Sequence, residues 1–188
     1  RFKAVHASTR QLARRHEIDL YPADPATGPG VRHALEAGAL VVHLEGVADD
    51  HAILDDGRVP LHRLGLNDRV WLVTLSGDAT TPAAMRSVRD TGANIIVGCR
   101  YPLAAHQTSA FLRALWQALA AGDSIASAVL RARFALTQLD GAENPSWASP
   151  LVWAAGDRRH EPALEAFPPR YCRQAGLSSI VFGDDEAG

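Results

Sequence analysis

His43 and Asp78 are the two residues whose type and position first suggest chemistry. His43 interrupts the apolar run "VVHL", and Asp78 follows the apolar run "VWLVTLSG". Short apolar runs that end in small and polar residues are typical of buried parallel strands, which deliver side chains to a site at their carboxyl ends. A hydrogen-bonded structural histidine inside a strand is therefore the favoured interpretation of His43, and a catalytic histidine is the alternative.

The sequence lacks the motifs of several common kinds of catalytic and binding site. A phospho-acceptor role for Asp78 needs a nearby cation, but the only lysine, Lys3, falls in the first predicted helix. The sequence contains no GxxxxGK[ST] phosphate loop, no GxGxxG after a strand and no GxSxG elbow. His16 and Glu17 lack the second histidine of a zinc-binding helix. We therefore predict no cofactor and no metal.

Composition narrows the class of protein further. The formal net charge of −2 gives no basic field for nucleic acid. The apolar stretches are far shorter than the roughly 20 residues of a membrane span, and the basic N-terminus lacks the apolar segment of a signal peptide. The two cysteines, Cys99 and Cys172, form no disulfide framework and have no metal-ligand spacing. With the strong preference for arginine and alanine, these features favour a bacterial cytoplasmic protein.

Strand and helix patterns alternate along the chain, which predicts an α/β sandwich with a mostly parallel sheet. An Asp-Gly turn within residues 53–61 predicts a hairpin, and "SSIVFG" (178–183) predicts an additional edge strand. The predicted strands are 17–22, 39–44, 70–76, 94–99 and 151–156, and the predicted helices are 2–16, a segment within 23–38, 81–92, 106–122 and 124–139.

The helix predicted at residues 2–16 is an unusual beginning for such a sheet, which normally opens with a strand. Two explanations remain open: the chain belongs to a longer protein, or another segment supplies that strand. We expect one domain over residues 1–156 and a C-terminal extension over 157–188 that packs on the sheet edge.

The order of elements resembles the CHAT domain, a bacterial branch of the caspase-like cysteine peptidases. The similarity covers roughly residues 1–156 and is most specific in "TGANIIVGCRYPLAAHQTSAFLRALWQALAAGDSIASAVLRARFAL". "NPSWASPLVWAAG" is similar to the closing loop and strand of the family, and "VVHLEG" and "VWLVTLSG" match its two site-bearing strands. The resemblance implies a caspase-like three-layer sandwich with helices on both sides of the sheet.

The resemblance also implies where a catalytic dyad would lie. In the family, a histidine beyond the first site-bearing strand activates a cysteine beyond the second, and backbone N–H groups beside glycines hold the oxyanion. Here His43 matches a supporting histidine of the family, and Val47 stands at the catalytic histidine position. Asp78 stands at the cysteine position, with Gly46 and Gly77 as the neighbouring glycines. Valine carries no proton, and a carboxylate is a poor nucleophile toward an amide.

Three functions follow as hypotheses. The first is a catalytically inactive CHAT domain that acts as a regulatory, scaffolding or protein-binding module in bacterial defence or signalling. Its partner would be another protein or another part of a longer chain, such as an active peptidase or its regulator. The second is an active cysteine peptidase with displaced residues, for which Cys99 with a nearby histidine is the fallback nucleophile and His51 and Ser76 are lesser candidates. The third is a flavodoxin-like domain that binds a small ligand at the strand ends.

Overall fold

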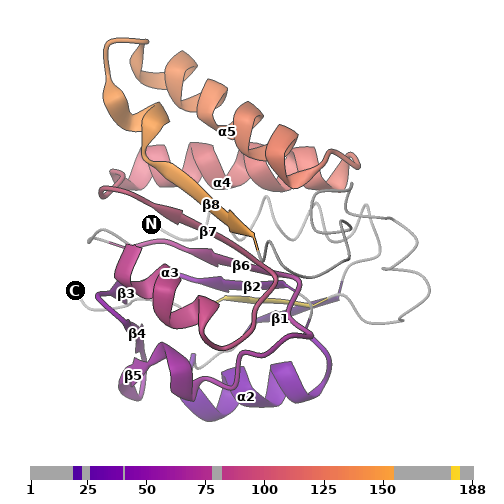
Figure 1. The fold of residues 1–188 in the computed structure, drawn as a ribbon. Coiled ribbons are helices and arrows are strands. Elements are labelled where there is room, and N and C mark those ends of the chain that lie inside the picture. The colour runs from indigo at the N-terminus through magenta and orange to yellow at the C-terminus, as the bar shows by residue number, and fades with distance from the viewer. Residues whose placement is uncertain (1–18, 23–25, 40, 78–81, 155–178, 183–188) are drawn as a thin grey trace.

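The computed structural model describes residues 19–22, 26–39, 41–77, 82–154 and 179–182. Its central feature is a six-stranded sheet in the order β1-β9-β2-β6-β7-β8 (Figure 1). All neighbouring strands are parallel except β7 and β8, which are antiparallel. The strands are β1 (Asp19–Pro22), β2 (Val41–Leu44), β6 (Leu72–Leu75), β7 (Ile95–Cys99), β8 (Pro150–Ala154) and β9 (Ser179–Phe182).

Helices cover both faces of this sheet, which makes the described part of the chain a mixed α/β structure. Helices α2 (Gly28–Glu36) and α3 (Pro82–Arg89) lie on one face, and α4 (Ala105–Ala120) and α5 (Ile125–Asp140) lie on the other (Figure 1). The predicted α/β class and mostly parallel sheet are therefore confirmed. The strands and helices predicted between residues 26 and 154 are all present within a few residues of their expected bounds, whereas the helix predicted at 2–16 lies outside the described residues.

Alternation along the strands divides the core into two layers. On β2, the side chains of Val42 and Leu44 join the core beneath α2 and α3. Val41, one residue out of phase, joins the core beneath α4 and α5. His43 shares the phase of Val41, because side chains two residues apart on a strand point to the same face. The histidine therefore points toward the α4 and α5 side of the sheet.

A small antiparallel sheet follows the carboxyl end of β2. It contains β3 (Val47–Ala48), β4 (His51–Leu54) and β5 (Gly57–Pro60), in that order. The predicted hairpin is confirmed, because β4 and β5 pair with Leu54 opposite Gly57. Gly57 has a φ of +114°, a conformation that L side chains rarely adopt.

The hairpin turn also caps α2. The Asp56 carboxylate accepts a hydrogen bond from the Gly28 N–H, with oxygen distances of 3.0 and 3.2 Å. Asp55 accepts one from the Ala26 N–H at 2.6 Å. The first N–H groups of a helix have no partner within the helix, and a negative charge there also interacts favourably with the helix dipole. The turn thus ties the small sheet to the main domain.

We expect Asp56→Ala to lower the free energy of unfolding by about 1 kcal/mol, because it removes the carboxylate that caps α2. Chemical denaturation measures this difference. Asp56→Asn keeps a side-chain acceptor and should recover most of the loss. Equal stability of the native chain and Asp56→Ala would show that this contact contributes nothing.

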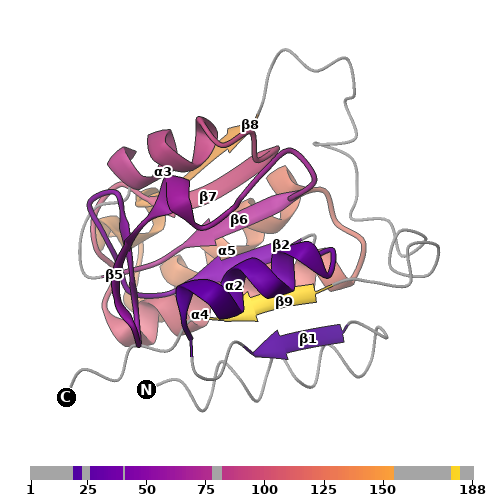
Figure 2. The same cartoon turned by 90° about the horizontal axis from the view of Figure 1, so that it is seen from below.

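The strand near the C-terminus occupies an interior position. The segment "SSIVFG" was predicted to lie at an edge of the sheet, but β9 lies between β1 and β2 and is parallel to both (Figure 2). Ile180, Val181 and Phe182 are residue types that are enriched in strands, and near-continuous apolar runs are typical of strands inside parallel sheets.

Candidate functional site

The two strands predicted to carry a site are direct neighbours. Beyond the paired residues of β2 and β6, the Ser76 N–H donates to the Leu44 carbonyl at 3.0 Å. The Val47 N–H then donates to the Ser76 carbonyl, also at 3.0 Å. The structure therefore brings together the carboxyl ends of these strands, and with them the backbone beside both positions of the expected dyad.

Val47 belongs to the apolar core at this point. Its side chain is only 2% exposed and packs in the same cluster as Ala52 and Leu54 of the hairpin. Its backbone pairs with Ala52 in the small sheet. The position at which the resemblance predicts a catalytic histidine thus holds an apolar side chain that faces the core, and this side chain offers no group that could accept a proton.

Gly77 lies in close contact with the backbone of Val47. A Cβ atom added to Gly77 would lie 2.2 Å from the Val47 carbonyl oxygen and 2.8 Å from the Val47 nitrogen. Gly46, on the other strand end, has a φ of +77° and accepts a hydrogen bond from the Ile53 N–H at 2.8 Å. Both glycines have a backbone reason to be glycine: a close approach at Gly77 and a left-handed turn at Gly46. Asp78 lies outside the described residues, so its place as the residue at the nucleophile position stays a prediction.

His43 is completely buried and is held by a neighbouring strand. Its Nδ1 lies 2.7 Å from the Thr74 Oγ1, and the two residues are paired in register between β2 and β6. Its Nε2 lies 4.0 Å from the carboxylate of Glu45, whose side chain is 19% exposed. A buried polar group needs such partners to offset its loss of water. This geometry favours the structural interpretation of His43.

Cys99 lies at the carboxyl end of β7, two residues beyond the level of His43. Val97 pairs with Thr74, which pairs with His43, so β6 separates the two candidate residues. With strands about 4.8 Å apart and a rise of about 3.3 Å per residue, their backbones lie on the order of 12 Å from each other. The structure therefore does not assemble a His43–Cys99 pair with the direct hydrogen bond of a catalytic dyad.

The environment of Cys99 also suppresses its reactivity. Burial raises the pKa of the Cys99 thiol to about 11, and a hydrogen bond with the Ser149 side chain lowers the pKa only in part. Ser149 is itself fully buried, and its hydroxyl donates to the Tyr101 carbonyl at 2.5 Å. Since the thiolate is the nucleophile, a thiol with this pKa is almost entirely in its unreactive form at neutral pH.

We expect Cys99 in the folded chain to react with iodoacetamide at pH 7.5 about a hundredfold more slowly than a free cysteine, because its pKa is raised by about two units. Mass spectrometry of Cys172→Ser protein, which leaves Cys99 as the only thiol, measures the rate. Labelling should become fast in denaturant and should accelerate as the pH rises toward 11. Rapid labelling of the folded protein at pH 7.5 would contradict this account of Cys99.

The two lesser candidates occupy different surroundings. The Ser76 hydroxyl is buried, and the described residues provide no hydrogen-bond partner for its Oγ. No base therefore activates this serine within the described part of the chain. His51 lies opposite Ala48 in the small sheet, where its Nδ1 is 2.6 Å from an Asp50 carboxylate oxygen. This contact keeps the His51 side chain beside its neighbour Asp50 on the hairpin.

Thr74 and Ser149 are the two site-flanking residues that sequence reasoning missed. Thr74 is a polar residue inside the run "VWLVTLS", as His43 is inside "VVHL". The signal that could have predicted the His43–Thr74 contact is one polar residue inside each of two apolar strands that pair with each other. Ser149 gave no such signal, because its partners near residues 99–101 lie about 50 positions away and meet it only through the antiparallel pairing of β7 and β8.

The described residues contain no group of three or more His, Cys, Asp and Glu side chains that could hold a metal ion. None of the helices in the described ranges is long and apolar enough to cross a membrane. The candidate site is thus a pair of adjacent strand ends, with the buried pair of His43 and Thr74 below them and an apolar residue, Val47, where the resemblance predicts a catalytic histidine. Comparisons with models of known protein families and with curated proteins found no match.

Proposed function

We propose that this chain is a catalytically inactive caspase-like domain of the CHAT type, which works by binding another protein. The observation that carries the proposal is the burial of Val47 in the core, at the end of the strand where a peptidase would present its histidine. The adjacent strand ends of β2 and β6 support the register of the resemblance. Helices on both faces of the sheet and the antiparallel edge strand β8 support the caspase-like sandwich.

The proposed role is that of a regulatory or scaffolding module in the bacterial cytoplasm. Its partner is an active peptidase, a regulator of one, or another part of a longer chain, in a defence or signalling system. The chemistry of the expected dyad positions supports a binding role, because Val47 cannot accept a proton and the carboxylate of Asp78 is a poor nucleophile toward an amide. The family resemblance alone suggests the biological setting.

Restoring the dyad tests the register on which this proposal rests. We expect the double variant Val47→His, Asp78→Cys to cleave members of a diverse peptide pool that the native chain leaves intact. The single variants Val47→His and Asp78→Cys are the matched controls, since each supplies only half of the dyad. Circular dichroism and thermal melting establish that the variants remain folded, because position 47 is buried.

A folded double variant that cleaves no more than the single variants would argue against the proposed register. If the double variant does not fold, Asp78→Cys alone still tests the site. The proposal predicts that it remains inactive, whereas cleavage by this single variant would show that another base already serves position 78.

The alternative function is an active cysteine peptidase that uses Cys99. The raised pKa of the thiol and its separation from His43 both weigh against it. Loss of a native cleavage activity in Cys99→Ala would favour this alternative.

A further inference from the structure

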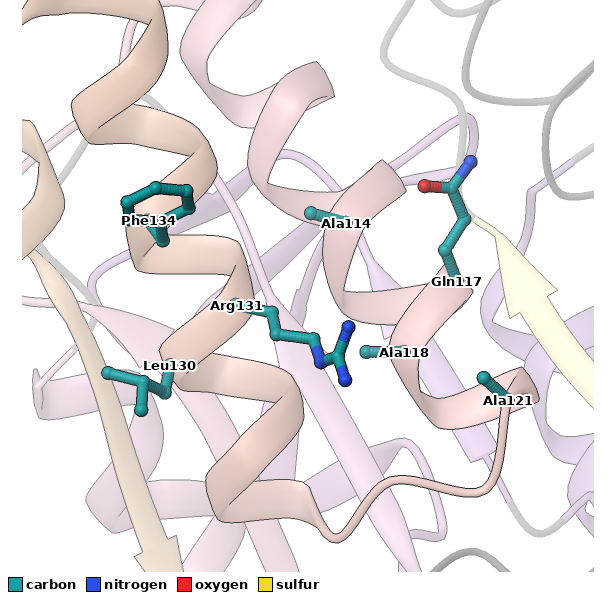
Figure 3. Close-up of a pocket in the computed structure, with 7 residues that line it drawn as sticks. All are labelled: Ala114, Gln117, Ala118, Ala121, Leu130, Arg131 and Phe134. Atoms are coloured by element: carbon teal, nitrogen blue, oxygen red, sulfur yellow. The ribbon is translucent and has the colours of Figure 1, made fainter.

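We draw no further inference here: the strongest candidate, the apolar groove between α4 and α5 that is lined by alanines of α4 and by Leu130 and Phe134 of α5 (Figure 3), carries none, because nothing in the described part of the structure shows what covers it.

Discussion

Gly77→Ala should lower the free energy of unfolding by about 3 kcal/mol. The added Cβ atom would lie 2.2 Å from the Val47 carbonyl oxygen, a contact that cannot exist without movement of the main chain. Such movement would strain the hydrogen bonds that join the ends of β2 and β6, which run from Val47 to Ser76 and from Ser76 to Leu44. Urea denaturation of the native and variant chains measures the difference.

Gly28→Ala is the matched control for this substitution. A Cβ atom at Gly28 meets its nearest neighbour, a side-chain nitrogen of Arg32, at 3.5 Å, which is ordinary van der Waals contact. Gly28 also begins α2, where alanine is well tolerated. We expect this control to change stability by less than about 1 kcal/mol. If the two variants are equally stable, the close approach of Gly77 to Val47 does not constrain the site.

Thr74→Val should cost about 1–3 kcal/mol, although it changes the side-chain volume very little. It removes the hydroxyl group that lies 2.7 Å from the Nδ1 of the buried His43. The loss leaves a polar ring atom without this partner in an environment that excludes water, and that desolvation is the source of the cost. Thermal and urea denaturation measure it.

Thr137→Val tests whether the loss comes from the buried contact and not from the exchange itself. Thr137 lies on α5, and its hydroxyl donates to the Arg133 carbonyl at 3.3 Å in a half-buried position. Water can replace this bond, so we expect a change of less than about 0.5 kcal/mol. Similar effects of the two substitutions would show that His43 gains no stability from Thr74, and would reopen a catalytic interpretation of this histidine.

The helices and strands that follow from the spacing of apolar residues, and from the residues that begin and end each element, could be predicted from the sequence. Ser124, a residue type that favours helix N-caps, accepts the Ser127 N–H at the start of α5. Gly38 directly follows the last turn of α2 and has a φ of +96°, a conformation that favours glycine. These features depend on residues within one or two turns of each other. Local rules of capping and turn formation therefore decide them.

The order of strands could not be read in this way. The segment at 179–182 has the apolar residues of a strand, but no feature of the nearby sequence shows that it lies between β1 and β2. That position depends on which unpaired strand edges remain after the rest of the sheet has formed, which is a property of the whole fold.

The candidate site also has one part that could be predicted from local sequence and one part that could not. The sequence identified His43, Gly46 and Gly77 as residues at two strand ends, and the pairing of β2 with β6 brings these strand ends together. It did not reveal that Val47 packs into the core, that Thr74 faces His43, or that Ser149 contacts Cys99. Each of these depends on segments that are distant in the chain.

Hydrolysis of a diverse pool of peptides and unfolded proteins by the native chain tests the central claim most directly. The claim is that this site has no catalytic dyad, so we predict no cleavage above that of matched Cys99→Ala and Ser76→Ala proteins. Mass spectrometry of the pool after long incubation detects even slow turnover. Cleavage by the native chain that disappears in either variant would contradict the account and would identify the nucleophile of an active peptidase.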